Sequence, residues 1–230
     1  MQLSVFQFTL IPVALAILAA ALAARVRPGP ETVSAIQHFA AGVVFAAAAG
    51  EILPDIMHAN FPLATLIGGA AGVTLMLGIK QLETRIRGPL GILSMIGFDL
   101  FMDGLILGIG FVAAVETGLL LTAALSLEVV FLALALSVDL QKDGYRAGKA
   151  VAMVAALMAL LPLGALLATP IAILPPAIVT GFFSFGLMAL LYLVTEELLA
   201  EAHEAPEKPW ITAMFFAGFL ALLLLEEMMG

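Results

Sequence analysis

The sequence predicts an all-α integral membrane protein with eight transmembrane helices in one domain, residues 1–230, and three observations support this fold class. Hydrophobic residues occupy 63% of the positions and charged residues 11%, whereas soluble domains average about 45–50% and about 25%. The apolar runs reach about 20 residues, the length with which a helix crosses a bilayer. These runs are continuous and do not alternate as the strands of membrane barrels do.

The first four predicted spans differ in how they end and in what they carry. The first, about 3–24, is closed by RVRPGP, and we interpret it as a retained span because it lacks the basic n-region of a signal peptide. The second, about 32–54, ends in EILPDIMH. The third, about 62–81, contains no acidic residue and is rich in glycine and alanine. The fourth, about 90–114, contains two aspartates within an apolar run.

The last four predicted spans are separated by short breakers. The fifth, about 118–139, carries Glu128 and follows the fourth after the hairpin AVETG, so these two spans are expected to be antiparallel neighbours. The sixth, about 147–168, is followed by TPIAILPP. The seventh, about 177–199, continues into EELLAEAHE, and the eighth, about 210–225, ends at EEMMG. No linker is long enough to separate a second domain.

The basic residues predict the orientation in the membrane. All nine Lys and Arg residues lie on one side of the eight-span arrangement, and the opposite loops contain none. By the positive-inside rule that side faces the cytoplasm, so both termini are expected outside in a multi-pass protein of the plasma (inner) membrane. No basic cluster suggests a nucleic-acid partner, and no cysteine is present as a ligand or disulfide partner. The nine are Arg25, Arg27, Lys80, Arg85, Arg87, Lys142, Arg146, Lys149 and Lys208.

Three carboxylates near the middle of the fourth and fifth spans are the candidate metal ligands. Asp99 and Asp103 are four residues apart and share one helix face, and Glu128 lies at the same expected depth. A carboxylate at a helix centre costs about 2.5–3.5 kcal/mol to insert, so three cost about 8–10 kcal/mol. Because no span contains a basic partner, the cost must be offset by a bound cation or by protonation. The alternative to a cation site is three protonated acids hydrogen-bonded to the backbone.

Two further acidic groups lie at span ends. Glu196, Glu197, Glu201 and His203 at the inner end of the seventh span are candidates for a secondary metal or exit site, with a solvated helix end as the alternative. Glu51, Asp55 and His58 at the outer end of the second span form a candidate entrance. The two segments GEILPDIMH and EELLAEAHE resemble each other but run in opposite directions, as an inverted repeat would leave them. His38 is expected to be interfacial, and Gly104 and Gly108 are expected to serve helix packing.

At these motifs the sequence resembles the ZIP (Zrt/Irt-like) family of divalent metal transporters. DLFMDG, Asp99–Gly104, is similar to the family's span-four signature His-Asn-x-x-Glu/Asp-Gly, and LEVVFL places Glu128 at the first position of its span-five signature His/Gln-x-x-x-Glu. YLVTEELLAEAHE and GEILPDIMH look like the family's ends of spans seven and two. The resemblance covers essentially the whole chain and implies eight spans with both termini outside. It also implies sliding of a unit that holds spans four and five.

The sequence departs from this family at its metal motifs. Asp99 stands where the family has histidine, and Leu100 stands where it has asparagine. Val129 and Leu132 occupy the remaining polar positions of span five, so the family's paired site looks reduced to one. Oxygen-only ligands suit Mn²⁺, Mg²⁺, Ca²⁺ or Fe²⁺ better than zinc, although carboxylates also bind zinc.

The sequence therefore predicts a transporter that moves a divalent cation of the Zn, Mn or Fe class towards the cytoplasm. The metal is expected as the transported substrate, with no resident cofactor, and a homodimer is kept open as the assembly. The alternative is a degenerate relative that couples protons or carries another substrate. An enzyme is not expected, because no span pairs a nucleophile with a histidine base and no HExxH pair is present.

Overall fold

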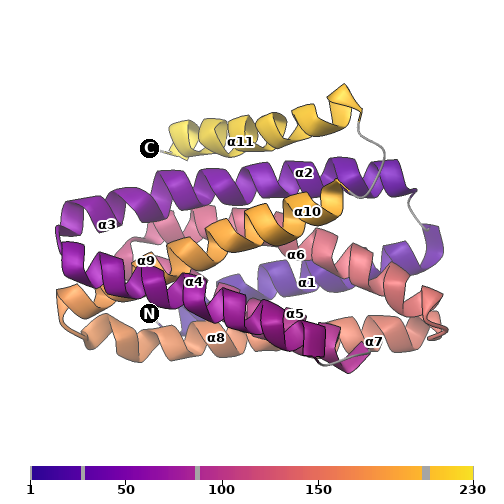
Figure 1. Ribbon diagram of the computed structural model, residues 1–230, viewed down its shortest axis with the longest axis horizontal. Coiled ribbons are helices and arrows are strands. Elements are labelled where there is room, and N and C mark those ends of the chain that lie inside the picture. The colour runs from indigo at the N-terminus through magenta and orange to yellow at the C-terminus, as the bar shows by residue number, and fades with distance from the viewer. Residues whose placement is uncertain (1, 27–28, 86–88, 204–207, 230) are drawn as a thin grey trace.

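Every secondary-structure element of the described chain is helical in the computed structural model (Figure 1). The structure describes residues 2–26, 29–85, 89–203 and 208–229. The α-helices are α1 Gln2–Val26, α2 Pro30–Ala47, α3 Leu53–Ala59, α4 Pro62–Arg85, α5 Pro89–Ala113, α6 Val115–Lys142, α7 Ala147–Met158, α8 Leu160–Ala168, α9 Pro176–Leu193, α10 Leu199–Ala202 and α11 Pro209–Met229. Two π-helical segments, η1 Ala48–Ile52 and η3 Val194–Leu198, and the 3₁₀ helix η2 Thr169–Ile173 complete the set.

This architecture is that of an all-α, multi-pass membrane protein. Seven helical segments of the described chain are long and apolar enough to cross a membrane, and they coincide with the predicted first to third and fifth to eighth spans. The predicted fourth span forms the 25-residue helix α5, several of whose side chains lie outside the described part. Because lipid offers no hydrogen bonds to the backbone, helices are the expected solution for such apolar runs.

Proline and asparagine place several of the helix boundaries. Pro30, Pro62, Pro176 and Pro209 each occupy the first position of a helix, where the missing N–H would have no intrahelical partner. Asn60 ends α3 in the left-handed conformation, with φ of 56°. These residues account for boundaries that the breakers in the sequence already indicated.

Two connections differ from the expectation. The predicted hairpin AVETG is shorter than five residues, because only Ala114, in an extended conformation, separates α5 from α6. The predicted sixth span is divided into α7 and α8 around Ala159. Pro162 lies in the first turn of α8 and has no N–H to donate to the carbonyl of Met158, where α7 ends.

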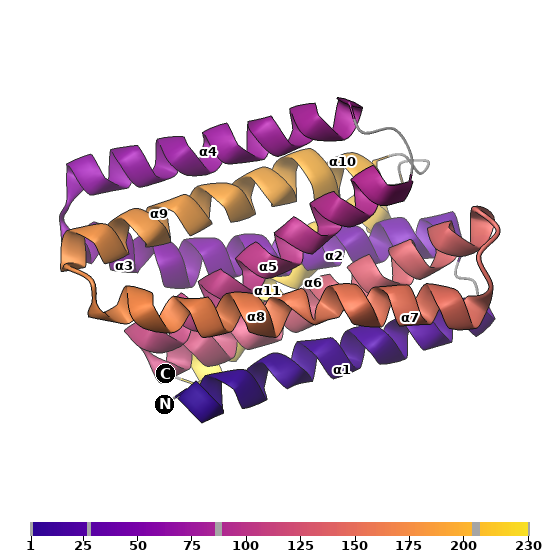
Figure 2. The same ribbon diagram turned by 90° about the horizontal axis from the view of Figure 1, so that it is seen from below.

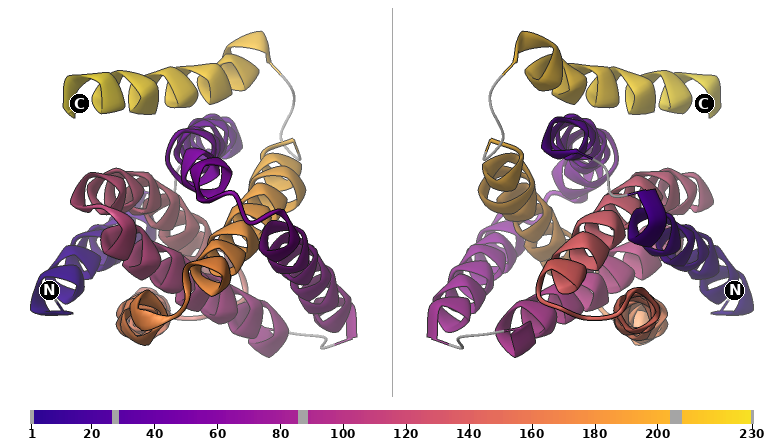
Figure 3. Two further views of the ribbon diagram at one scale, coloured as in Figure 1. Left: turned by 90° about the vertical axis from the view of Figure 1, so that its left-hand side faces the viewer. Right: turned by 90° about the vertical axis from the view of Figure 1, so that its right-hand side faces the viewer.

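The long helices pack in four pairs, α1 with α6, α5 with α8, α2 with α11 and α4 with α9. The views in Figures 2 and 3 show α4 and α11 at the margins of the bundle and α2 and α9 nearer its centre. In the apolar window of the segment Pro30–Ala59, 56% of the residues are buried within the protein, compared with 17% for Pro62–Gln81 and for Pro209–Met228. The outer helices therefore leave most of their apolar surface facing outward.

Glycine allows α5 and α8 to approach closely beside the carboxylate motif. A Cβ atom at Gly104 would lie 1.9 Å from the carbonyl oxygen of Leu161, and one at Gly164 would lie 2.0 Å from that of Phe101. Gly108 similarly faces Ala165 and Ala168. The prediction that Gly104 and Gly108 serve helix packing is confirmed.

Both π-helical segments carry acidic residues and interrupt long helices. Segment η1 joins α2 to α3 and contains Glu51, whereas η3 joins α9 to α10 and contains Glu196 and Glu197. Each overlaps one of the two segments whose sequences resemble each other. Isolated π-turns inside α-helices are frequent at functional sites.

Candidate metal centre

Three carboxylates from α5 and α6 meet inside the bundle. Asp99 and Asp103 project from one face of α5, and Glu128 projects from the middle of α6. One carboxylate oxygen from each residue lies within 4.8 Å of the other two. The predicted convergence of these three side chains is confirmed, while their role as metal ligands stays a prediction.

The cluster is buried and incompletely hydrogen-bonded. The exposed fraction is 2% for Asp103 and 2% for Glu128, whereas Asp99 is partly exposed. Asp103 Oδ2 and Glu128 Oε2 have no hydrogen-bond partner in the structure. A buried polar atom without a partner is costly, and more so when it carries charge. The arrangement therefore favours a bound cation or shared protons.

No basic side chain of the described chain forms an ion pair with the cluster. The ion pairs found there join Lys80 to Glu196, Lys142 to Asp139 and Lys208 to Glu31, all with solvent-accessible side chains. Within the described part of the chain, no basic side chain offsets the charge of these acids.

Apolar residues surround the cluster at the positions where the resemblance would call for polar ligands. Leu100 and Val129 are both 0% exposed and belong to the hydrophobic core. Leu132 is partly buried and packs against the same core. These side chains fill space and cannot ligate, so the first coordination shell available from α5 and α6 consists of oxygen atoms.

A fourth carboxylate comes near the cluster from η3. Glu197 interacts electrostatically with Asp99, Asp103 and Glu128. From the sequence, Glu197 was grouped with its neighbours at the end of the seventh span, and its approach to the middle of the bundle was missed.

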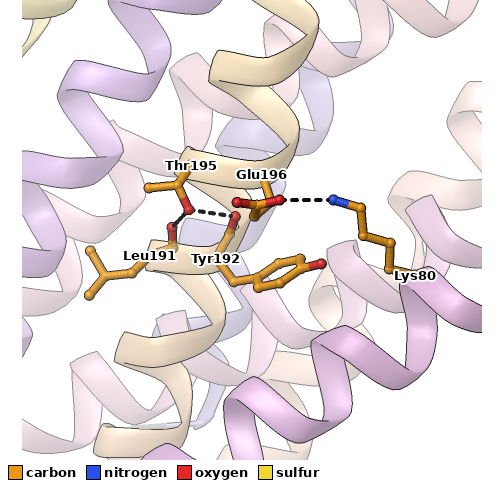
Figure 4. Close-up of polar contacts among 5 residues, drawn as sticks. All are labelled: Lys80, Leu191, Tyr192, Thr195 and Glu196. Carbon is orange, nitrogen blue, oxygen red and sulfur yellow. Dashed lines mark hydrogen bonds and ion pairs between the residues drawn. The ribbon is translucent and has the colours of Figure 1, made fainter.

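Residues of the candidate exit group contact different neighbours, and their role as a secondary metal or exit site stays a prediction. Glu196 accepts a hydrogen bond from Lys80 Nζ at 3.0 Å (Figure 4), and Lys80 also lies 5.6 Å from the ring centroid of Tyr192. Glu201 accepts a hydrogen bond from Gln37 Nε2 at 2.9 Å. The physical reason is the helical rotation, which directs successive residues to different neighbours.

His203, the last member of that group, contacts a residue the sequence did not connect with it. Its ring centroid lies 5.0 Å from that of His38. His38 is 3% exposed and therefore lies inside the protein, while its expected depth near the membrane interface stays a prediction. Burial between α2 and α10 is a tertiary property that the local sequence does not reveal.

Two acids beyond those expected, Glu116 and Glu226, lie close enough to the candidate entrance to interact with Glu51. Thr117 donates a hydrogen bond to the Glu51 carboxylate, which also interacts electrostatically with Asp55, Glu116 and Glu226. Asp55 in turn interacts with His58. The ligand atoms of Glu51, Asp55 and His58 do not converge as those of the central cluster do. Glu116 and Glu226 were missed because they begin α6 and end α11, far apart in sequence.

A large apolar groove lies elsewhere, between α4 and α9. Its volume is about 680 Å³, and its lining includes Phe61, Ile67, Ile178 and Phe182. Because the lining is almost entirely apolar, the groove offers no ligand to a cation.

No model of a known protein family matches the chain, and a search of curated proteins finds no match. The resemblance to the ZIP family therefore rests on the sequence motifs alone and stays a prediction.

Proposed function

We propose that this chain is a ZIP-like transporter that moves a divalent metal ion across the membrane towards the cytoplasm. The observation that carries the proposal is the convergence of Asp99, Asp103 and Glu128 between long apolar helices. Two of their oxygens have no partner, and no basic side chain of the described residues pairs with them. Intramembrane carboxylates in such an arrangement are typical of ion pathways. The cation would offset the cost of burying them, and their oxygens would replace part of its water shell.

The packing pattern supports eight spans arranged as an inverted repeat. In the proposed repeat, α1 corresponds to α7–α8, α2 to α9, α4 to α11 and α5 to α6. The contact between α1 and α6 therefore has its counterpart in the contact between α8 and α5. The contact between α2 and α11 likewise corresponds to the contact between α9 and α4. All four helix contacts are present. Segments η1 and η3 also correspond to each other. Transporters with inverted repeats hold their substrate near the midplane between the repeats, which is where we place the three carboxylates.

The orientation follows from the basic residues. The ends of α4 and α6 and the start of α11 lie at one end of the bundle, with Lys80, Lys142 and Lys208 beside them, while α1 begins and α11 ends towards the other (Figure 1). With the basic end in the cytoplasm, both termini face outward. The acidic group around Glu51 would then attract cations at the outer mouth.

The ligand chemistry indicates the class of metal. Carboxylate-only sites suit Mn²⁺, Fe²⁺, Mg²⁺ or Ca²⁺, and Zn²⁺ binds carboxylates as well. Glu197, which interacts electrostatically with all three ligands, adds negative charge on the side from which η3 approaches. Sliding of α5 and α6 against the remaining helices, as the family resemblance implies, would carry the site between the two faces.

Uptake of metal into proteoliposomes loaded with a metal-sensitive dye tests the proposal. Asp103→Asn and Glu128→Gln each remove a charge without changing side-chain volume and should abolish uptake of Mn²⁺ or Zn²⁺. Asp139→Asn is the matched control, because Asp139 is an exposed acid on the same helix as Glu128 and should leave uptake unchanged. Undiminished uptake by both site variants would refute the assignment. Proton flux without metal uptake in the unmodified protein would favour the proton-coupled alternative.

A further inference from the structure

The cytoplasmic end assigned above holds a pair of histidines that the central site does not use. His38, on α2, is 3% exposed, and its ring meets that of His203, which directly follows α10, with centroids 5.0 Å apart and an interplanar angle of 64°. Hydrogen bonds on the same two helices hold the pair together. Ser34 Oγ donates to the Ala202 carbonyl at 2.6 Å, and Gln37 Nε2 donates to Glu201 Oε2 at 2.9 Å.

Both imidazoles are oriented by the backbone of their own helix. Nδ1 of His38 lies 2.9 Å from the Ser34 carbonyl oxygen, and Nδ1 of His203 hydrogen-bonds the Leu199 carbonyl oxygen. Because a carbonyl oxygen only accepts, Nδ1 carries the proton in each ring. In the neutral tautomer this leaves the Nε2 lone pair of both rings free to bind a ligand. Metal-bound histidines characteristically donate their other ring N–H to a backbone carbonyl or a carboxylate.

The unpartnered atom at this end is Nε2 of His38, which is buried and has no hydrogen-bond partner in the structure. A buried lone pair without a donor costs free energy. An electrophile bound to Nε2 removes the cost.

The spacing of the rings fits one shared ion. A tetrahedral metal with metal–nitrogen bonds of about 2.0 Å holds two imidazole centroids about 5 Å apart. The observed centroid separation of 5.0 Å equals that value. His203 is exposed, so water can reach the site and fill the remaining positions.

We propose that His38 and His203 form a second divalent-metal site, at the end of the bundle where α2 begins and α10 ends. Its nitrogen ligands select borderline ions such as Zn²⁺, Co²⁺ or Ni²⁺, in contrast to the oxygen ligands of the central cluster. An ion bound there links α2 to α10. The proposal does not depend on transport, because the two imidazoles bind metal whether or not the central carboxylates do.

The test uses the full chain in detergent with Asp103→Asn and Glu128→Gln introduced to remove the central site, and Zn²⁺ as the probe. The protein has three histidines, so NMR resolves each imidazole. Zn²⁺ should shift the Nε2 resonances of His38 and His203 together. His38→Gln or His203→Gln should weaken Zn²⁺ binding by about tenfold or more, given that even loss of an outer partner costs 10–100-fold.

Asp139→Asn is the control, because Asp139 is an exposed acid on α6 outside the proposed sites, and it should bind Zn²⁺ like its parent. His203→Gln alters an exposed side chain, so a folding defect does not confound it. The proposal is overturned if Zn²⁺ shifts neither or only one of the paired rings, or if His203→Gln binds as tightly as the parent. Retained Zn²⁺ binding in the Asp103→Asn, Glu128→Gln background would separate this site from the transport site.

Discussion

Replacing Gly104 with alanine should disturb both the stability of the bundle and the geometry of the carboxylate cluster. The new Cβ would lie 1.9 Å from the Leu161 carbonyl oxygen, whereas ordinary van der Waals contact begins at 3.4 Å. To increase the distance from 1.9 Å to 3.4 Å, α5 and α8 must separate locally by about 1.5 Å. The obstruction is backbone, so no side-chain rotation relieves it.

The expected cost follows from this overpacking. Forcing extra atoms into a well-packed interface costs about 1–3 kcal/mol. In a chain of this size, each kcal/mol lowers Tm by about 2–4 °C. Asp103 directly precedes Gly104, so the same displacement changes the distance between its carboxylate and that of Glu128. Because metal sites tolerate deviations of only about 0.2 Å, metal uptake should fall together with Tm.

Thermal unfolding in detergent, followed by far-UV circular dichroism, and uptake into proteoliposomes measure the two effects. Gly78→Ala is the control, because a Cβ there meets nothing within 4 Å in the long helix α4. Alanine at Gly78 should leave uptake unchanged and raise stability by about 0.5–1 kcal/mol. Equal Tm and uptake in Gly104→Ala and Gly78→Ala would refute the argument that backbone contact between α5 and α8 fixes the site.

Two further predictions concern the charged residues. Mn²⁺ at 100 times its Kd should stabilise the unmodified protein by about 2.7 kcal/mol and so raise its Tm. It should not raise the Tm of Glu128→Gln. Equal metal-induced Tm shifts in both proteins would contradict ligation by Glu128. Lys80→Met should lower the free energy of unfolding by less than about 1 kcal/mol, because the ion pair of Lys80 with Glu196 is solvent-accessible. Chemical denaturation measures this loss. A larger value would contradict the assignment of this contact as an ordinary exposed ion pair.

The fold class could be predicted from the sequence because few kinds of secondary structure can cross a lipid bilayer. Long apolar runs must satisfy their backbone hydrogen bonds internally, so hydropathy indicates helices and proline indicates their starts, as at Pro62 and Pro176. The convergence of Asp99 and Asp103 was also predictable, since residues four apart share a helix face. Glu128 could be added because a short connection makes α5 and α6 antiparallel neighbours.

The groups at the helix ends could not be predicted in the same way. Glu196, Glu197 and His203 are neighbours in sequence, yet they face Lys80, the central carboxylates and His38 respectively. The direction of each side chain depends on its rotation about the helix axis, which the π-helical turn of η3 shifts. Which helix lies opposite is decided by packing alone.

The sequence by itself thus determined the all-α membrane architecture, most span boundaries and the three-carboxylate cluster, because each follows from a local periodicity or from the solvent around the helix. Only the tertiary structure decided that His38 is buried against His203, that Glu197 interacts electrostatically with the central acids, and that α5 lies against α8 at Gly104. These features join residues far apart in the chain, and their distances are set by how closely whole helices can approach.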